Sequence, residues 1–259
     1  MIFEKVYYDT AENKKRCFWD ILVLKTRFYF YLKFFLIILK ANKFVKQGKF
    51  DNAEYCRTSD KTFKLLENCG AKIHIKGLEN LKKVEGPVVF IGNHMSILET
   101  FILPGLIIPF KPVSFVVKES LIKHFFFGGV MKATNPISVT RTDPKKDFKS
   151  VMSGGRILLK KGRSIIVFPQ STRGDFIVGE FGSIGDKLAQ KAGVSVIPIA
   201  LKTDFWSNGR ISKDFGRIYR KRDVYLEFGN PINTDIEKKE RHSIIVNFIE
   251  AKLNEWSEQ

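Results

Sequence analysis

The sequence of 259 residues has few cysteines and no internal repeat or low-complexity linker. Its three cysteines, Cys17, Cys56 and Cys69, match neither a metal-binding nor a redox spacing. Because their number is odd, they cannot all pair within the chain, and we expect free thiols in a reducing compartment. A Gly-x-Ser-x-Gly pattern is also missing, which argues against a covalent serine hydrolase.

Acidic residues are scarce relative to basic ones. The chain has 27 Asp and Glu against 44 Lys and Arg, a formal net charge of +17. Such a charge predicts attraction to nucleic acid, an acidic carrier protein or anionic lipid. The 24 phenylalanines favour lipid. A nucleic-acid-binding protein is the alternative, but we expect no nucleic-acid partner, because the basic residues are scattered and match no known nucleic-acid-binding pattern.

No apolar run is long enough to cross a bilayer. The densest stretch, 28–39, is apolar apart from Lys33, whereas a spanning helix needs about 20 apolar residues. No cleavable signal sequence is evident. We expect 18–45 to form an amphipathic helix in the membrane interface, with lysines that reach the head groups. Packing on the protein's own core and a shallow re-entrant hairpin are the alternatives.

Strand-like segments rich in β-branched and aromatic residues recur from residue 72 onward. They are 72–76, 88–91, 113–117, 137–140, 164–168, 194–201 and 224–228. Helix-like stretches occupy 51–69, 148–161, 185–192 and 238–255, with Gly70 as the terminator of the first.

This alternation predicts an α/β fold with a mixed, mostly parallel sheet of about seven strands covered by helices. We predict that residues 1–60 form an N-terminal membrane-associating helical segment and that 61–259 form the α/β domain. The polar residues 1–16 are expected to be loosely ordered. The expected location is peripheral or monotopic on the cytoplasmic face of a membrane.

The stretch 88–99 carries a buried-strand pattern into a polar pair, His94 and Glu99. His94 follows the strand, at the carboxyl end where open α/β sheets bind ligands. Residues five apart on a helix point roughly 140° away from each other, so the pair can meet only if His94 precedes the helix. Glu99 would then orient the imidazole and leave one nitrogen to take a proton. A strand-end histidine beside a solvated glutamate is the alternative.

Four blocks, in order and spacing, resemble the glycerolipid acyltransferase family of the bacterial 1-acylglycerol-3-phosphate type. They are 93–99, 136–141, 168–173 and 196–201. The resemblance implies an O-acyltransferase that moves a fatty acyl chain from an acyl thioester to a lysophospholipid hydroxyl; the expected reaction converts lysophosphatidic acid to phosphatidic acid. The acyl donor would be acyl-CoA or acyl carrier protein, and the protein would act at an anionic membrane surface. No cofactor or metal would be needed.

The resemblance also implies roles for single residues. His94 would be the general base and Glu99 its orienting partner. The remaining substrate-binding residues would be Lys118, Arg141, Gln170, Ser171, Thr172 and Arg173. Among these, the arginines would bind the acceptor phosphate, and Gln170 and Thr172 would hold the glycerol hydroxyls.

The sequence departs from the family pattern in three places. Glu99 stands where aspartate is usual, Gln170 and Ser171 replace Glu-Gly, and 181–185 lacks the usual lysines. The alternative function is therefore a catalytically inert membrane lipid-binding protein of the same fold.

Three further expectations concern the surroundings of His94. Backbone amides of its turn are candidate oxyanion donors, and Asn93 is a candidate helix cap. The aromatic stretch 124–129 either lines the entrance for the acyl chain or packs into the core.

Overall fold

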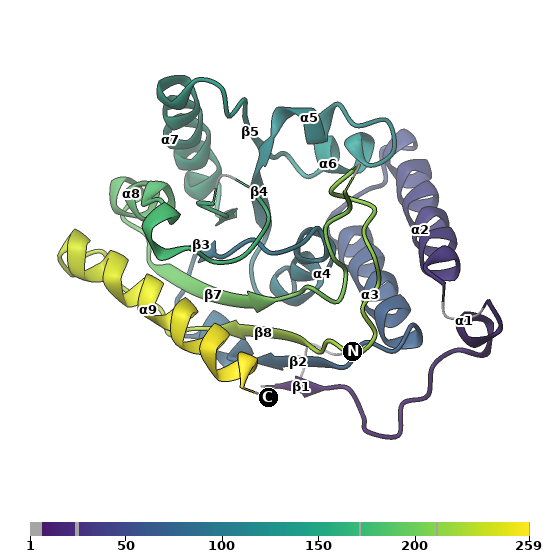
Figure 1. The fold of residues 1–259 in the computed structure, drawn as a ribbon. Coiled ribbons are helices and arrows are strands. Elements are labelled where there is room, and N and C mark those ends of the chain that lie inside the picture. The colour runs from purple at the N-terminus through teal and green to yellow at the C-terminus, as the bar shows by residue number, and fades with distance from the viewer. Residues whose placement is uncertain (1–6, 24–25, 171, 211, 259) are drawn as a thin grey trace.

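The computed structural model describes residues 7–23, 26–170, 172–210 and 212–258. Within them, eight strands form one sheet in the order β1-β2-β8-β7-β3-β6-β4-β5 (Figure 1). The strands are β1 (Tyr8–Asp9), β2 (Ile73–Lys76), β3 (Val89–Gly92), β4 (Val113–Lys118), β5 (Ile137–Val139), β6 (Ser164–Val167), β7 (Val196–Lys202) and β8 (Val224–Phe228). The pairs β1–β2 and β7–β8 are antiparallel, and the others are parallel. The predicted mixed, mostly parallel sheet is confirmed.

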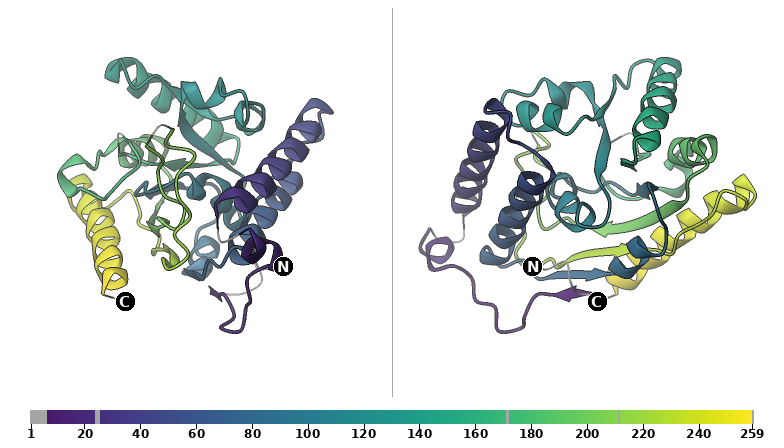
Figure 2. Two further views of the ribbon diagram at one scale, coloured as in Figure 1. Left: turned by 45° about the vertical axis from the view of Figure 1, so that its right-hand side comes forward. Right: turned by 180° about the vertical axis from the view of Figure 1, so that it is seen from behind.

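Helices cover the sheet on its two faces (Figures 1 and 2). One face carries α7, α8 and α9, and the other carries α2, α3 and α4. The helices are α1 (Phe18–Leu22), α2 (Phe28–Lys46), α3 (Asn52–Asn68), α4 (Leu98–Ile107), α5 (Glu119–Ile122), α6 (Gly128–Ala133), α7 (Pro144–Lys160), α8 (Ile184–Ala192) and α9 (Lys238–Ser257). Short 3-10 helices span Leu78–Lys82 and Val178–Glu180.

The central strand β3 shows why the apolar runs in the sequence are continuous rather than alternating. Its side chains point to opposite faces in turn: Val89 and Ile91 pack in the cluster under α7–α9, and Phe90 packs in the cluster under α2–α4. A strand buried on both faces needs apolar residues at every position. The strand therefore delivers the residues that follow it to a fixed place at the edge of the sheet.

Helix boundaries follow local chemistry. The helix expected from residue 148 begins at Pro144, because Asp143 caps it by accepting from the backbone amides of Lys145 and Lys146 at 3.1 and 3.0 Å. Gly70, the expected terminator after α3, has φ +93°, a value that favours glycine.

The expectation of loose order for 1–16 is wrong for residues 8–10. Residues 8–9 form β1, which pairs with β2. The hydroxyl groups of Tyr8 and Thr10 donate to one carboxylate oxygen of Glu67 at 2.6 and 2.7 Å. These long-range contacts attach the segment to α3, and a local reading of the sequence does not reveal them. Residues 1–6 lie outside the described residues.

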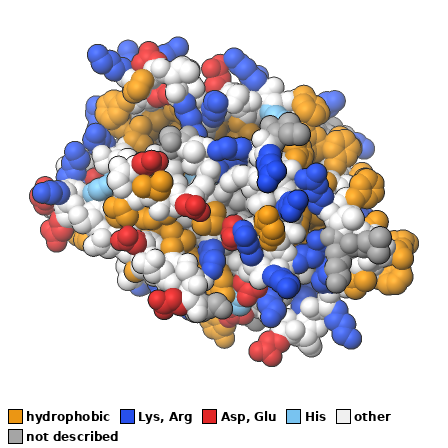
Figure 3. Space-filling view, in the orientation of Figure 1, with side chains coloured by type: hydrophobic (Ala, Val, Ile, Leu, Met, Phe, Trp, Pro, Cys, Tyr) orange, Lys and Arg blue, Asp and Glu red, His pale blue; other side chains and the backbone are white. Residues whose placement is uncertain are grey.

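The stretch 18–45 forms two helices, α1 and α2, instead of one. One side of α2 is buried in the core through Phe30, Phe34 and Ile38. The other side exposes Leu32, Leu36 and Leu39 by 44, 49 and 46 %. Figure 3 shows hydrophobic side chains gathered along the right-hand edge of the molecule, where α1 and α2 lie. The core-packing alternative therefore accounts for only one face of α2.

The division at residue 60 stays a prediction, and this residue lies inside α3. Among the described helices, none combines the length and the apolar character that crossing a membrane requires.

The aromatic stretch 124–129, like α2, has both buried and exposed aromatic side chains. Phe126 and Phe127 are buried, whereas Phe125 is 90 % exposed. The Phe126 ring stacks on Phe35 of α2, with 4.8 Å between centroids. Core packing thus accounts for two of the three rings.

Candidate active site

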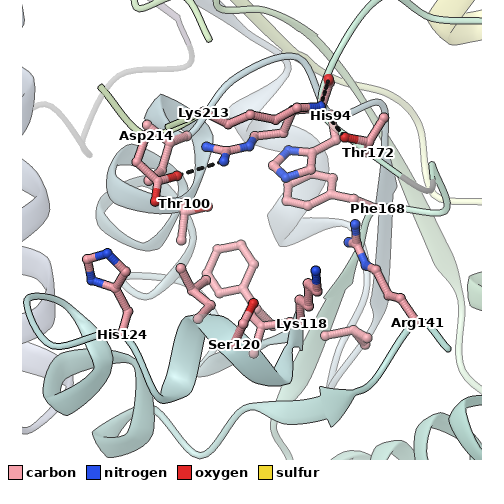
Figure 4. Close-up of a pocket in the computed structure, with 16 residues that line it drawn as sticks. His94, Thr100, Lys118, Ser120, His124, Arg141, Phe168, Thr172, Lys213 and Asp214 are labelled. Atoms are coloured by element: carbon pink, nitrogen blue, oxygen red, sulfur yellow. Dashed lines mark hydrogen bonds and ion pairs between the residues drawn. The ribbon is translucent and has the colours of Figure 1, made fainter. Parts of the chain in front are cut away.

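A pocket of about 420 Å³ opens at the carboxyl ends of the parallel strands (Figure 4). Four neighbouring strands each send a residue to it just past or at their ends: His94 after β3, Lys118 at the end of β4, Arg141 after β5 and Thr172 after β6. Arg173 also lines it. Because these strands are parallel, their carboxyl ends meet at one edge, which is the usual ligand site of such sheets.

His94, which lines this pocket, meets Glu99 behind the pocket wall. Nδ1 of His94 lies 2.5 Å from Oε2 of Glu99. His94 precedes the helix α4, as the spacing required, and Glu99 lies in its first turn. A carboxylate only accepts hydrogen bonds, so in the neutral imidazole Nδ1 carries the proton and Nε2 keeps a lone pair. The imidazole is 14 % exposed, and a neutral imidazole held in this way is able to accept a proton at Nε2.

The second oxygen of Glu99 is held as firmly as the first. Oε1 accepts from the backbone amides of Met95 and Ser96 at 2.8 and 2.9 Å and from the hydroxyl of Thr203 at 2.5 Å. The Glu99 side chain is completely buried. With four donors the buried carboxylate is compensated, which an isolated buried charge would not be.

The expectation that amides of the His94 turn serve as oxyanion donors is wrong for three of them. The amide of His94 donates to Oε1 of Gln170 at 2.7 Å, and the amides of Met95 and Ser96 donate to Glu99. An N–H group that is already engaged is not available to a substrate oxygen.

Gln170 and the ring of Phe168 hold the histidine from the side of β6. Gln170 is buried and donates through its amide nitrogen to the carbonyl of Asp175 at 3.1 Å. The rings of His94 and Phe168 stack, with centroids 4.3 Å apart. Gln170 is not among the residues that line the pocket, so its predicted contact with substrate stays a prediction. A glutamate here would lack the donor that bonds Asp175.

Asn93 does not cap α4. Its side-chain amide donates to the carbonyl of Leu201 at 2.7 Å and accepts from the amide of Leu201 at 2.9 Å. This fully buried side chain continues the pairing of β3 with β7 past the end of the strand. The result is a fixed register between His94 and the residues that follow β7.

Cationic side chains surround the histidine. Lys118, Arg141, Arg173 and Lys213 line the pocket, and Figure 4 shows Lys118 and Arg141 across the open space from Lys213. Desolvation, and then the charge of Arg173, lower the pKa of Arg141; a guanidinium nevertheless remains charged in proteins. The pocket is therefore suited to an anionic group.

Arg141 is held in an unusual backbone conformation. Its φ is +62°, which costs about 1–3 kcal/mol for a residue other than glycine. The carboxylate of Asp147, in the first turn of α7, accepts from the amides of Arg141 and Thr140 at 2.6 and 2.7 Å. These bonds aim the arginine toward the pocket.

Two charged residues of the pocket were not identified by the sequence analysis. Asp214 accepts from Arg173 at 2.6 Å, and Lys213 donates to the hydroxyl of Thr172. Both come from the segment 204–223, which has neither a repeating pattern nor a motif, so no sequence signal marks them. Ser171, predicted to bind substrate, lies outside the described residues.

Within the described residues, no group of three or more His, Cys, Asp or Glu side chains is arranged to hold a metal ion. The fold and the pocket together define a class: α/β proteins in which a histidine, backed by a buried carboxylate, faces a cationic pocket. Such proteins can withdraw a proton from a substrate held by its anionic group.

Comparison with known proteins identifies the family. The family model named Acyltransferase matches residues 72–202, about half of the chain, and the chain belongs to this family. A 1-acyl-sn-glycerol-3-phosphate acyltransferase of Pseudomonas aeruginosa is 36% identical over 153 residues, covering 58% of this chain and 57% of that protein. A chloroplastic enzyme of the same name from Arabidopsis thaliana is 36% identical over 134 residues, covering 50% and 36%. The chain thus spans 57% or less of these two relatives.

A solved structure shares the fold. The crystal structure of the 1-acyl-sn-glycerophosphate acyltransferase PlsC from Thermotoga maritima aligns with a TM-score of 0.65, covering 90% of this chain and 96% of that chain. The sequence identity is 19%, so this likeness concerns the fold alone.

Proposed function

We propose that the protein is an O-acyltransferase that moves a fatty acyl chain from an acyl thioester to the hydroxyl of lysophosphatidic acid. The observation that carries this proposal is the His94–Glu99 contact of 2.5 Å at the edge of a cationic pocket. Family membership and the names of the relatives support the acceptor.

The reaction uses His94 twice. Nε2 takes the proton of the acceptor hydroxyl as its oxygen attacks the thioester carbonyl, which gives a tetrahedral intermediate. The C–S bond then breaks, and the proton passes from His94 to the departing sulfur, which leaves as a thiol. Glu99 stabilises the transient imidazolium and keeps the ring in place. Base catalysis by a positioned side chain contributes roughly 10²–10⁴-fold to the rate.

The cations of the pocket bind the acceptor phosphate. Arg141 and Arg173 offer planar guanidinium groups suited to bidentate contact with phosphate oxygens, and Lys118 and Lys213 add positive charge. Asp214 holds Arg173 at the pocket wall. The donor is acyl-CoA or acyl carrier protein, two anionic partners that suit a net charge of +17.

The test is thiol release and lipid product formation by the purified protein with acyl-CoA, or with acyl carrier protein, and a panel of lysolipids. We expect product with lysophosphatidic acid and a loss of at least about 10²-fold in kcat for His94→Ala. His242→Ala is the matched control, because His242 lies on α9 and does not line the pocket. Its activity should equal that of the unmodified protein.

A folded preparation that forms no product with any acceptor or donor would contradict the proposal. That result would favour the alternative, an inert lipid-binding protein of the same fold, which binds lysolipid equally well with and without His94.

We also propose that the exposed faces of α1 and α2 dock on the cytoplasmic face of an anionic membrane. Phe18 and Trp19 of α1 are 67 and 60 % exposed. Leu32, Leu36 and Leu39 form a stripe on α2 at helical spacing, and this face lies beside basic residues (Figure 3). Apolar side chains inserted at the interface, together with nearby basic residues, bind anionic bilayers.

Sedimentation with vesicles tests this docking. We expect the double variant Leu32→Glu, Leu36→Glu to lose at least about tenfold in affinity for anionic vesicles, because each carboxylate must stay out of the apolar layer. Ile157→Glu is the control: Ile157 lies on α7, on the opposite face of the sheet, and is 55 % exposed. Equal loss in both proteins would contradict the proposal.

A further inference from the structure

Thr203 lies directly after β7 and is completely buried. β7 pairs with β3 in parallel, with Gly92 opposite Ile199, so the residues that leave the two strands run side by side. The two hydrogen bonds between Asn93 and Leu201 extend this pairing. Thr203 is thereby brought next to the turn that carries His94, although it lies outside the blocks in which the sequence analysis placed site residues.

The hydroxyl of Thr203 donates to Oε1 of Glu99 at 2.5 Å. The hydroxyl of Ser96 lies 3.1 Å from the Thr203 hydroxyl and 3.0 Å from the Thr203 carbonyl, toward which it acts as a donor. Its oxygen accepts from the amide of Leu98 at 3.2 Å. This chain of contacts directs the single proton of the Thr203 hydroxyl to the carboxylate.

The two oxygens of Glu99 have different partners. Oε2 contacts the imidazole, and Oε1 accepts from two amides and from Thr203. The two amides belong to Met95 and Ser96, on the same turn as His94, so they would move with it. Of these donors, Thr203 directly follows β7 and ties the carboxylate to the sheet.

We propose that Thr203 is a positioning residue for catalysis, which acts through Glu99 to hold the imidazole of His94 in its reactive orientation. This inference rests on the proposed function. A side chain with the extra methylene of glutamate has one more rotatable bond than aspartate, and a donor from β7 restricts it. The role belongs to the hydroxyl group, so a residue of the same shape without it should not replace threonine.

Steady-state kinetics of acyl transfer test the proposal. Thr203→Val removes the hydroxyl and keeps the shape; Thr203→Ala removes it without adding a methyl group next to the carboxylate. We expect either variant to lower kcat about tenfold or more, because a misplacement of about 1 Å in a reacting group can cost roughly 10²-fold, with KM for each substrate within about twofold. Thr203→Ser should recover most of the lost kcat.

Thr62→Val is the matched control. Thr62 is completely buried on α3 and donates its hydroxyl proton to the carbonyl of Thr58 at 3.0 Å, remote from Glu99. It should unfold at a temperature similar to that of Thr203→Val and keep the kcat of the unmodified protein. This comparison separates loss of a buried hydrogen bond from loss of orientation.

Three results would overturn the inference: a kcat for Thr203→Val and Thr203→Ala equal to that of the unmodified protein, failure of Thr203→Ser to recover activity, or an equal loss in Thr62→Val. In each of these the unmodified protein transfers acyl chains, so the proposed function stands. An unmodified protein without transfer activity would refute the proposed function and the role of Thr203 together.

Discussion

At the scale of the residue, the carboxylate of Glu99 determines the geometry of the site. Aspartate is usual at this position in the family that the sequence resembles. Here Oε2 of the longer side chain lies 2.5 Å from Nδ1 of His94, and Oε1 accepts from the amides of the turn and from Thr203. The length of the side chain and the position of its partners are therefore matched, and changing one alone disturbs the imidazole.

Glu99→Asp tests this match. Removing one methylene withdraws the carboxylate by about 1.5 Å if the backbone stays in place, and a misplacement of about 1 Å can cost roughly 10²-fold in rate. We expect kcat to fall by at least about tenfold, measured as product formation at saturating substrate.

Glu54→Asp is the control for the same chemical change, because Glu54 is also buried, on α3, and pairs with Arg57 at 2.9 Å. A kcat for Glu99→Asp equal to that of the unmodified protein would show that the pair tolerates a shorter acid.

At the scale of the element, the segment 204–223 joins the N-terminal helices to the pocket. The hydroxyl of Tyr31, on α2, donates to the carbonyl of Gly216 at 2.7 Å and accepts from the ring nitrogen of Trp206 at 3.0 Å. Two residues before Gly216, Asp214 accepts from Arg173. The helix that exposes apolar side chains is thus connected through one short segment to the pocket wall.

Tyr31→Phe tests whether this connection affects the binding of the acceptor lipid. Loss of the hydroxyl removes two hydrogen bonds that fix the segment, so we expect KM for lysophosphatidic acid to rise about fivefold and kcat to change less.

Tyr29→Phe is its control on the same helix, since the hydroxyl of Tyr29 contacts the sulfur of Cys17 at 3.5 Å instead. A rise in KM of the same size in both variants would mean that α2 acts on the whole protein and not on the pocket.

At the scale of the whole molecule, one buried ion pair fastens the outer helices on one face of the sheet. Arg241 of α9 and Asp186 of α8 are 0 and 1 % exposed in their side chains and contact each other directly. The guanidinium also donates to the carbonyls of Thr234 and Ile236 at 3.2 and 2.6 Å. Because both side chains of the ion pair are withdrawn from water, losing one of them leaves a buried charge unpaired.

We therefore expect Arg241→Ala to lower the free energy of unfolding by about 3–5 kcal/mol, measured by denaturant titration. Lys64→Ala, which removes an exposed partner of Asp60 at 2.7 Å, should cost less than about 1 kcal/mol. Equal effects would show that burial does not decide the strength of these pairs.

Much of the fold could be predicted from the sequence because its signals are local. Continuous apolar runs mark strands buried on both faces, and each of the seven expected strands is present within about two residues. The strand β1 was missed because its order depends on Glu67, nearly sixty residues away along the chain.

The sequence by itself determined the residue types at the strand ends: a histidine, an acid five residues later and basic residues after the following strands. The strand pattern shows where each strand ends, and the carboxyl ends of parallel strands lie at the same side of the sheet. The sequence therefore indicates that these residues lie near one another. Only the tertiary structure decided which partners those residues have. In the folded chain Thr203 bonds Glu99, and Asp214 bonds Arg173. Gln170 accepts from the amide of His94, and the next two amides of that turn donate to Glu99. The physical reason is that hydrogen bonds between distant segments depend on strand order and loop path, which no local pattern encodes.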